Sequence, residues 1–139
     1  MDFSQFLLKT YLHWELYLHK NQFPYIGRCY AWARRAEADK ISDMTVAEME
    51  ELFISVIPHW EHAVQQLYQP SRTNLAILGN ETPHLHAHLI PRYIVQKNFY
   101  GIAFQDPNPY GNYAPYPKKE LSLEVLLKIK QEIQQKLKE

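Results

Sequence analysis

The pattern of apolar and polar residues along the chain predicts four strands, with a long helix between the second and the third. Period-two alternation, which sends successive side chains to opposite faces of a strand, occurs over residues 15–19, 27–34, 74–78 and 84–90. Apolar residues recur at helical spacing from Met49 to Leu67, after Thr45 and Glu48, which match a capping box. Pro58 lies opposite this apolar stripe, so we expect a kink there that leaves the buried face of the helix intact.

Shorter segments complete the prediction toward the two ends of the chain. Residues 2–13 place apolar side chains at helical spacing, and Ser122 is suited to cap a final helix. Pro91 predicts a break or bulge after the fourth strand, and residues 100–104 predict a fifth strand. Residues 106–119 are rich in Pro, Tyr, Asn and Gly, which favours an ordered loop packed by its aromatic side chains.

Together these elements predict one α+β domain over residues 1–139. It would contain an antiparallel sheet of about five strands, one long helix and short terminal helices. We expect its core within about residues 15–95, and a C-terminal loop and helix within 106–138.

Composition narrows the class of protein. The chain has 139 residues, 46% of them apolar and 22% charged, which is typical of a soluble globular protein. Its formal net charge is zero, which argues against a dedicated nucleic-acid-binding protein because such proteins usually carry a basic excess. Cys29 is the only cysteine, so no internal disulfide can form. The N-terminus does not resemble a secretory signal and no apolar run is long enough to span a membrane, so we expect a cytoplasmic location.

Three histidines carry the clearest chemical signal in the sequence. His84, His86 and His88 alternate with small apolar residues, so one face of the strand carries all three imidazoles. The other face carries the apolar residues Leu85, Ala87 and Leu89. A row of imidazoles is costly to bury and is well suited to proton and phosphoryl chemistry near neutral pH.

Three interpretations of this row are open from the residues alone. It can be an exposed strand that happens to carry histidines. It can also be a metal site, which usually adds a carboxylate, although the next carboxylates along the chain are those of Asp106 and Glu120. The third interpretation is nucleophilic catalysis on phosphorus by a neutral imidazole. Asn80 and Thr82, on the turn just before the strand, could then donate hydrogen bonds to the same phosphate.

The motif resembles the signature of the histidine triad (HIT) superfamily of nucleotide hydrolases and transferases, which is His-φ-His-φ-His-φ-φ with φ apolar. Residues 84–90 match it at all seven positions, and Pro91-Arg92 follows as in many members. The wider order of elements over roughly residues 15–95 also looks like a HIT domain. The resemblance extends to a bacterial-type subgroup with segments like Leu78-Gly79-Asn80 before the triad and Tyr113-Ala114-Pro115-Tyr116 after it.

The resemblance implies roles for particular residues. The middle histidine of the motif is the family's nucleophile, which would be His86, and it would form a nucleotidyl-histidine intermediate that water hydrolyses. His84 would orient this nucleophile, and His88 would bind the phosphate and assist the leaving group. Asn80 stands about where the family places a polar amide near the phosphate. His19 and Asn21 are candidates for the ribose and base pocket by their position alone.

The chain departs from the family pattern in two segments. Only Glu81-Thr82-Pro83 stands where many members have a longer, Gly-rich loop. Ile26-Gly27-Arg28 stands where many have Pro-Gly-His, so a histidine becomes Arg28. The guanidinium fork of Arg28 matches a phosphate and would suit a longer polyphosphate, but it can equally lie on the surface or pair with a carboxylate.

The resemblance thus implies a nucleotide hydrolase or transferase, similar to diadenosine polyphosphate hydrolases, that cleaves a phosphoanhydride or phosphoramidate bond. A non-catalytic nucleotide-binding protein on the same fold and a metal-dependent hydrolase are the alternatives. We expect no required cofactor and no resident metal, although a polyphosphate substrate could arrive with magnesium. The edge strands of the sheet and the 14% aromatic content, together with the family's habit of pairing, predict a homodimer.

Overall fold

A computed structural model describes residues 3–138. The helical segments are η1 (Phe3–Phe6), η2 (Ile41–Asp43), α1 (Val46–Glu51), η3 (Leu52–Val56), α2 (Ile57–Tyr68) and α3 (Leu123–Leu137). The strands are β1 (Leu7–Thr10), β2 (Trp14–Leu18), β3 (Cys29–Ala33), β4 (Arg72–Ala76), β5 (His86–Arg92), β6 (Lys97–Phe99) and β7 (Ile102–Phe104).

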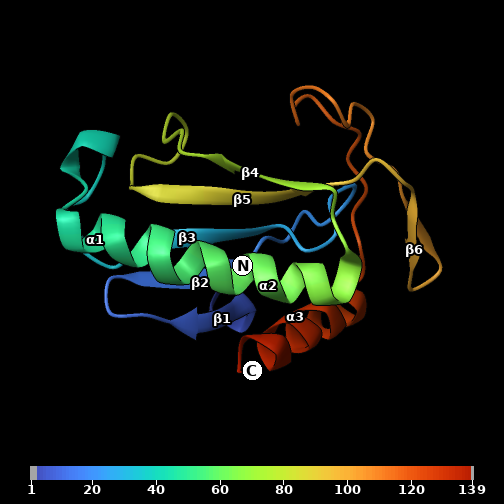
Figure 1. Ribbon diagram of the computed structural model, residues 1–139, viewed down its shortest axis with the longest axis horizontal. Helices are drawn as coiled ribbons and strands as arrows, with labels where there is room; N and C mark the ends of the chain where they lie inside the picture. Colours follow the sequence, from blue (N-terminus) through green and yellow to red (C-terminus); the bar gives the residue numbers. More distant parts are fainter. Residues whose placement is uncertain (1–2, 139) are drawn as a thin grey trace.

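Five strands form one antiparallel sheet, in the order β1-β2-β3-β5-β4. The continuous helix made by α1, η3 and α2 crosses one face of this sheet, and α3 lies beside α2 below it (Figure 1). The α+β prediction is therefore confirmed, with an antiparallel sheet of five strands.

The predicted N-terminal helix is wrong. Its first residue lies outside the described part of the chain, and the rest forms the 3-10 turn η1 and the edge strand β1 instead. β1 pairs with β2 and buries Phe6 and Leu8 in the core. A segment this short has little helical stability of its own, so pairing with a neighbouring strand decides its structure.

The long helix begins as predicted. The Thr45 hydroxyl accepts the N–H of Glu48, and the Glu48 carboxylate accepts the N–H of Thr45. Its irregularity is a π-helical turn, η3, in which the N–H of Ile57 bonds to the carbonyl of Leu52, just before Pro58. Pro58 follows as the second residue of α2, so its missing N–H falls where the π turn already changes the hydrogen-bond pattern of the helix.

The buried stripe of this helix is narrower than the sequence predicted. The sheet-facing residues from η3 onward follow one another mostly at intervals of four, namely Leu52, Val56, Trp60, Ala63, Val64 and Tyr68. Met49 and Phe53, which were expected on the same stripe, are 48% and 49% exposed. They lie beside the contact with the sheet. The π turn has more residues per turn than an α-helix, so it changes which side chains face the sheet at this end of the helix.

The main core lies between this helix and the sheet. The sheet contributes the buried side chains Leu16, Leu18, Cys29, Ala31, Ala33, Ala87 and Leu89, and the loop before β5 adds Leu85. The Nε1–H of Trp60 donates to the carbonyl of Gly27, and that of Trp14 to the carbonyl of Glu48, so both buried indoles are satisfied. The Cys29 thiol is completely buried in this layer.

The histidine strand begins and ends later than predicted. β5 starts at His86, so His84 lies in the loop before it, and it continues through Pro91 without a break. Pro91 is tolerated because β3 pairs with β5 only as far as Leu89, which leaves Pro91 a partner strand on the β4 side alone.

The segment after β5 also differs from the prediction. Residues 97–104 form a separate hairpin of β6 and β7, and β1 takes the place expected for the fifth strand of the main sheet. The turn of the hairpin contains Tyr100 and Gly101, both at positive φ, as in the tight turns that join two twisted strands. The final helix α3 is confirmed, with the Ser122 hydroxyl accepting the N–H of Val125.

Residues 106–119 contain no helix or strand, as predicted, and the loop is tied to the end of β5 through Arg92. The Arg92 guanidinium forms a bidentate ion pair with Asp106 at 2.8 and 3.1 Å. It also donates to the Asn74 side chain and to the carbonyls of Asn108 and Gly111. Among residues 3–138, no helix is both long and apolar enough to cross a lipid bilayer.

Candidate active site

The triad imidazoles occupy the face of the sheet opposite the long helix. In the register of β3 and β5, Trp32 pairs with His86 and Tyr30 pairs with His88, so these side chains share that face. The intervening residues Ala31 and Ala87 point to the helix and are buried. The structure therefore places His86 and His88, the two histidines that lie in the strand, on one face of the sheet, as the alternation in the sequence predicts.

The hydrogen bond of His86 fixes its tautomer. Its Nδ1 lies 2.6 Å from the carbonyl oxygen of His84. Because a carbonyl oxygen can only accept, Nδ1 must carry the proton, and in the neutral ring Nε2 keeps its lone pair. In its neutral form, His86 therefore has one ring nitrogen anchored and the other available for nucleophilic attack.

His84 supports this arrangement from the loop before the strand. Its Nε2 lies 2.6 Å from the carbonyl oxygen of Ala33, to which it must donate by the same reasoning. Its ring stacks on the indole of Trp32, with centroids 4.1 Å apart and planes 17° apart. Trp32 also stacks on His86 at 5.6 Å. The indole thus restrains both rings, a role that the local sequence pattern does not predict.

His88 completes the row. Its ring centroid lies 4.9 Å from that of His86, in an edge-on arrangement. Burial, followed by the positive charge of Arg28 and the neighbouring His86, lowers its pKa to about 4. Its Nδ1 is buried and has no hydrogen-bond partner within the described residues. His88 is thus a neutral ring with unused hydrogen-bonding capacity beside the candidate nucleophile.

The two residues proposed for the ribose and base pocket lie next to the triad but are already engaged. The ring of His19 lies 5.8 Å from that of His88, and burial, followed by Arg28 and His88, lowers the His19 pKa to about 2. The backbone N–H of Asn21 donates to Nδ1 of His19, so the remaining proton of His19 is on Nε2. Asn21 thus acts on this site through its backbone.

Stability should fall as the pH falls below about 6.5. His19 and His88 have lower pKa values folded than unfolded, so between about pH 6.5 and 4 the unfolded chain binds more protons. Above about pH 6.5 the two neutral histidines do not reduce the free energy of unfolding. Below it, each histidine that stays neutral contributes a slope of up to about 1.4 kcal/mol per pH unit, reduced by solvent screening at the partly exposed His88.

Chemical denaturation at pH 7.5, 6.0 and 5.0 measures this slope. His19→Asn should flatten it, whereas His62→Asn, which removes an exposed histidine, should leave it unchanged. A His19→Asn variant with the wild-type slope would contradict the prediction.

Arg28 is buried, with 4% of its surface exposed, and it lies on the triad side of the molecule. Its Nη1 donates to the hydroxyl of Tyr116 at 2.8 Å, and its guanidinium lies over the rings of Tyr113 and Tyr116. Of the interpretations left open by the sequence, a surface position is wrong, and no carboxylate among residues 3–138 pairs with it. The loop 106–119 therefore meets the candidate site at Arg28.

Asn80 and Thr82 are both exposed, in the loop between β4 and β5. The contact that this loop makes to the triad is through the backbone, where the N–H of His84 donates to the carbonyl of Thr82. The structure thus brings His19, Arg28 and the triad together. It leaves the Asn80 and Thr82 side chains at the rim, where a role in phosphate binding stays a prediction.

Aromatic residues of β2 and β3 extend the site. Tyr17 stacks on Tyr30 with centroids 5.1 Å apart, and Tyr30 meets His19 edge-on. Alternation within residues 27–34 had placed Tyr30 and Trp32 on one face. Local alternation does not predict the register between β3 and β5, which places Tyr30 and Trp32 beside the histidines.

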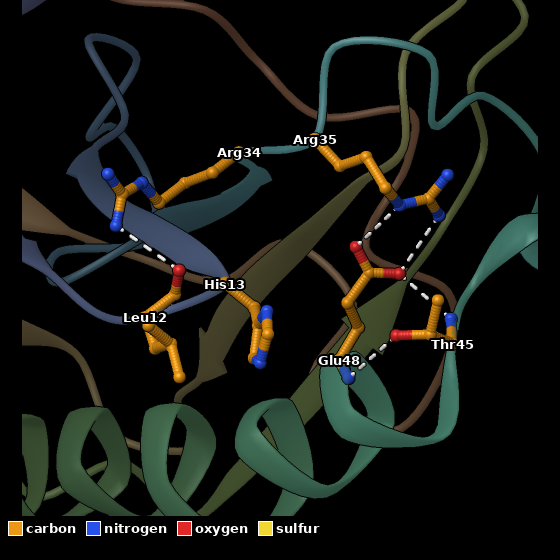
Figure 2. Close-up of a pocket in the computed structure, with 6 residues that line it drawn as sticks. All are labelled: Leu12, His13, Arg34, Arg35, Thr45 and Glu48. Carbon is orange, nitrogen blue, oxygen red and sulfur yellow. Dashed lines mark hydrogen bonds and ion pairs between the residues drawn. The ribbon is translucent and has the colours of Figure 1, made fainter.

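A cavity of about 510 Å³ lies elsewhere. It is lined by Leu12, His13, Arg34, Arg35, Thr45 and Glu48 (Figure 2). Figure 2 shows Glu48 between Arg35 and Thr45, to both of which it is bonded. Hydrogen bonds from Arg35 hold the pKa of the Glu48 carboxyl below its usual range, so the chemical groups here are used in holding the structure. We therefore place the candidate active site at the triad.

Among residues 3–138, no group of three or more histidine, cysteine, aspartate or glutamate side chains is arranged to hold a metal ion.

Comparison with known proteins finds one family model that matches part of the chain and solved structures that resemble its fold. Residues 32–95 match the family model of the HIT domain. A histidine triad protein from Marinobacter aquaeolei has a TM-score of 0.74 and 20% identity, over 95% of this chain and 88% of that one. A histidine triad protein from Bradyrhizobium japonicum has a TM-score of 0.73 and 18% identity, over 94% of this chain and 89% of that one.

A more distant structure has a function in its name. Diadenosine triphosphate hydrolase from Plasmodium falciparum, in complex with cyclomarin A, has a TM-score of 0.61 and 14% identity, over 97% of this chain and 77% of that one. At such identities the likeness is one of fold. No curated protein sequence matches the chain significantly.

Proposed function

We propose that this chain is a nucleotide hydrolase or nucleotidyl transferase that works through His86, because residues 32–95 match the family model of the HIT domain and the fold is that of histidine triad proteins. The observation that carries the proposal is the hydrogen bond from Nδ1 of His86 to the carbonyl of His84, which leaves Nε2 with a free lone pair. The ring restraints from Trp32 support it, because a nucleophile reacts faster when its orientation is fixed beforehand.

In the proposed reaction, Nε2 of His86 attacks the phosphorus of a nucleoside phosphoanhydride or phosphoramidate. The P–N bond to His86 forms as the bond from phosphorus to the leaving group breaks, and the leaving group keeps the electron pair and takes a proton from solvent. The ring then carries a positive charge, which the Nδ1–H···O bond to the His84 carbonyl stabilises. Water then attacks the phosphorus of the nucleotidyl-histidine, the P–N bond breaks and its electron pair returns to Nε2. The proton of the attacking water passes to solvent, the mononucleotide is released and the ring is neutral again.

The other two histidines assist through their positions and their hydrogen-bonding groups. His84 holds its position through Ala33 and Trp32, and its own carbonyl anchors the nucleophile. His88, whose pKa is about 4, stays neutral at pH 7 and offers a ring N–H to the phosphoryl oxygens and the leaving group.

A substrate screen tests this proposal. Purified protein is incubated with adenosine and guanosine polyphosphates and phosphoramidates, and mononucleotide release is measured by chromatography. We expect release from at least one class and, with a phosphoramidate, undiminished release in a chelator, since the covalent route needs no metal-activated water. Nucleotide binding without release would support a non-catalytic protein, and activity that the chelator abolishes on a phosphoramidate would support a metal-dependent hydrolase.

We also propose that the protein is a homodimer. The first half of the long helix carries a patch of exposed apolar residues, Val46, Met49, Phe53 and Ile54, which are 48–71% exposed. Patches of this kind often mark interfaces, and closed two-fold pairs are the commonest assembly. Light scattering at micromolar concentration should give twice the chain mass of 16.5 kDa. Phe53→Glu should shift this mass toward the monomer value, and a wild-type mass near 16.5 kDa would contradict the proposal.

A further inference from the structure

Two buried arginines of this protein have very different surroundings. Arg92 is 2% exposed and is fully engaged, by the Asp106 carboxylate and three further oxygen acceptors. Arg28 is 4% exposed and has one hydrogen bond, to the neutral hydroxyl of Tyr116. Its Nε is buried and has no partner within the described residues. A buried cation without an anion is costly, and that cost is removed when an anion binds.

The backbone around Arg28 is held rigidly. The buried Gln22 side chain donates to the carbonyls of His19 and Arg28 and accepts the N–H of Gly27. Gly27 has φ +98°, and a Cβ there would stand 2.9 Å from a methyl group of Val64, so this position requires glycine. Such a fixed corner holds a cation at one place, as a binding site requires.

The neighbours of Arg28 are suited to the same anion. His19 and His88 are both kept neutral, in part by the charge of Arg28 itself, so each can donate an N–H without adding charge. The unpartnered Nδ1 of His88 and Nε of Arg28 are buried polar atoms that still lack a ligand among the described residues. In the register of the sheet, Tyr30 pairs with His88, which places Arg28 beyond His88 on the side away from His86.

We propose that Arg28, His19 and His88 form an anion subsite that binds a second phosphate of the substrate, on the side of the group that leaves. This inference rests on the proposed function and adds a substrate class to it, a nucleotide with at least one phosphate beyond the one that His86 attacks. Tyr113 and Tyr116 cover the guanidinium and shield it from water, which strengthens its attraction for phosphate. The HIT domain match begins at residue 32, so His19 and Arg28 lie before the segment that matches the family model.

Binding of inorganic pyrophosphate tests the subsite without relying on catalysis. The histidine ring signals are followed by NMR at pH 7 during the titration. In the wild type we expect the signals of His19 and His88 to shift, and in Arg28→Met we expect at least about 10-fold weaker binding, the loss typical for a charge-assisted hydrogen bond. Arg28→Lys, which keeps the charge, should bind with intermediate affinity.

Arg34→Met is the matched control, because it removes an exposed arginine that follows the same strand and bonds only to the carbonyls of Tyr11 and Leu12. Pyrophosphate binding that leaves His19 and His88 unshifted in the wild type, or equal affinity in Arg28→Met, overturns the proposal. If Arg28→Met does not fold, the proposal is still tested by the histidine signal shifts of the wild type and by the pyrophosphate affinity of Arg28→Lys.

Kinetics separate this inference from the proposed function. Arg28→Met should lower kcat/KM for a nucleoside polyphosphate by about 10- to 100-fold and change it by less than about 3-fold for a phosphoramidate with a neutral amine leaving group. An equal loss on both substrates overturns the subsite. If the wild type turns over neither, the proposed function fails while the pyrophosphate titration still tests Arg28.

Discussion

Replacing His86 with asparagine should abolish turnover, by more than about 10⁴-fold, while the protein stays folded. General acid–base assistance alone contributes about 10²–10⁴-fold, and losing the group that forms the covalent bond removes the whole route. Asparagine keeps a polar side chain beside Trp32 and His88 and leaves the helix-facing core untouched. Initial rates with the best substrate of the screen measure the loss, and thermal unfolding checks the fold.

The covalent step gives a second readout. Protein that is quenched during turnover should show a nucleotidyl adduct by intact-mass spectrometry in the wild type and none in His86→Asn. His62→Asn is the matched control, because His62 is exposed on the long helix, and it should keep full activity. If His86→Asn retains more than a tenth of wild-type activity, another group is the nucleophile.

Replacing Arg92 with methionine should destabilise the protein by about 3–5 kcal/mol, because it leaves the Asp106 carboxylate buried without its partner. Hydrogen bonds from Arg92 and from the backbone N–H groups of Asn108 and Tyr93 outweigh burial and hold the Asp106 pKa below its usual range. All five hydrogen bonds of the guanidinium would be lost together. For a chain of this length we expect Tm to fall by roughly 10–20 °C.

Denaturant unfolding measures this change directly. The exposed Arg34→Met should stay within about 0.5 kcal/mol of the wild type. Adding Asp106→Leu to Arg92→Met should restore part of the loss, since the unpaired charge is then removed. An Arg92→Met variant within about 1 kcal/mol of the wild type would show that the pair is not needed for stability.

Local pattern was sufficient where each element has an unambiguous period. The triad strand, the capped long helix and the final helix were all predictable, because apolar and polar positions there agree with one geometry. The helix predicted over residues 2–13 is wrong because apolar side chains at helical spacing in this segment also fit a short edge strand that only β2 can stabilise. Local spacing cannot distinguish the two when the partner strand decides.

The surroundings of the site were less predictable, for a related reason. Arg28 meets Tyr116, which is 88 residues away along the chain, through a loop with no regular structure. Periodicity says nothing of where such a loop lies, so the choice between a phosphate ligand, a surface residue and an ion pair stayed open. The stacking of Trp32 on His84 likewise depends on the pairing of β3 with β5, which local patterns do not specify.

The rate at which the Cys29 thiol reacts can be used to measure local unfolding of the sheet around β3. The thiol lies in the central strand β3, completely buried on the side of the sheet opposite the triad, and burial raises its pKa. An alkylating reagent must reach a thiolate, so it reacts only with molecules in which β3 has separated from its neighbours. β3 also carries Trp32, which stacks on His84, and Ala33, whose carbonyl accepts a hydrogen bond from His84. The rate of Cys29 labelling therefore also measures how often the candidate site opens.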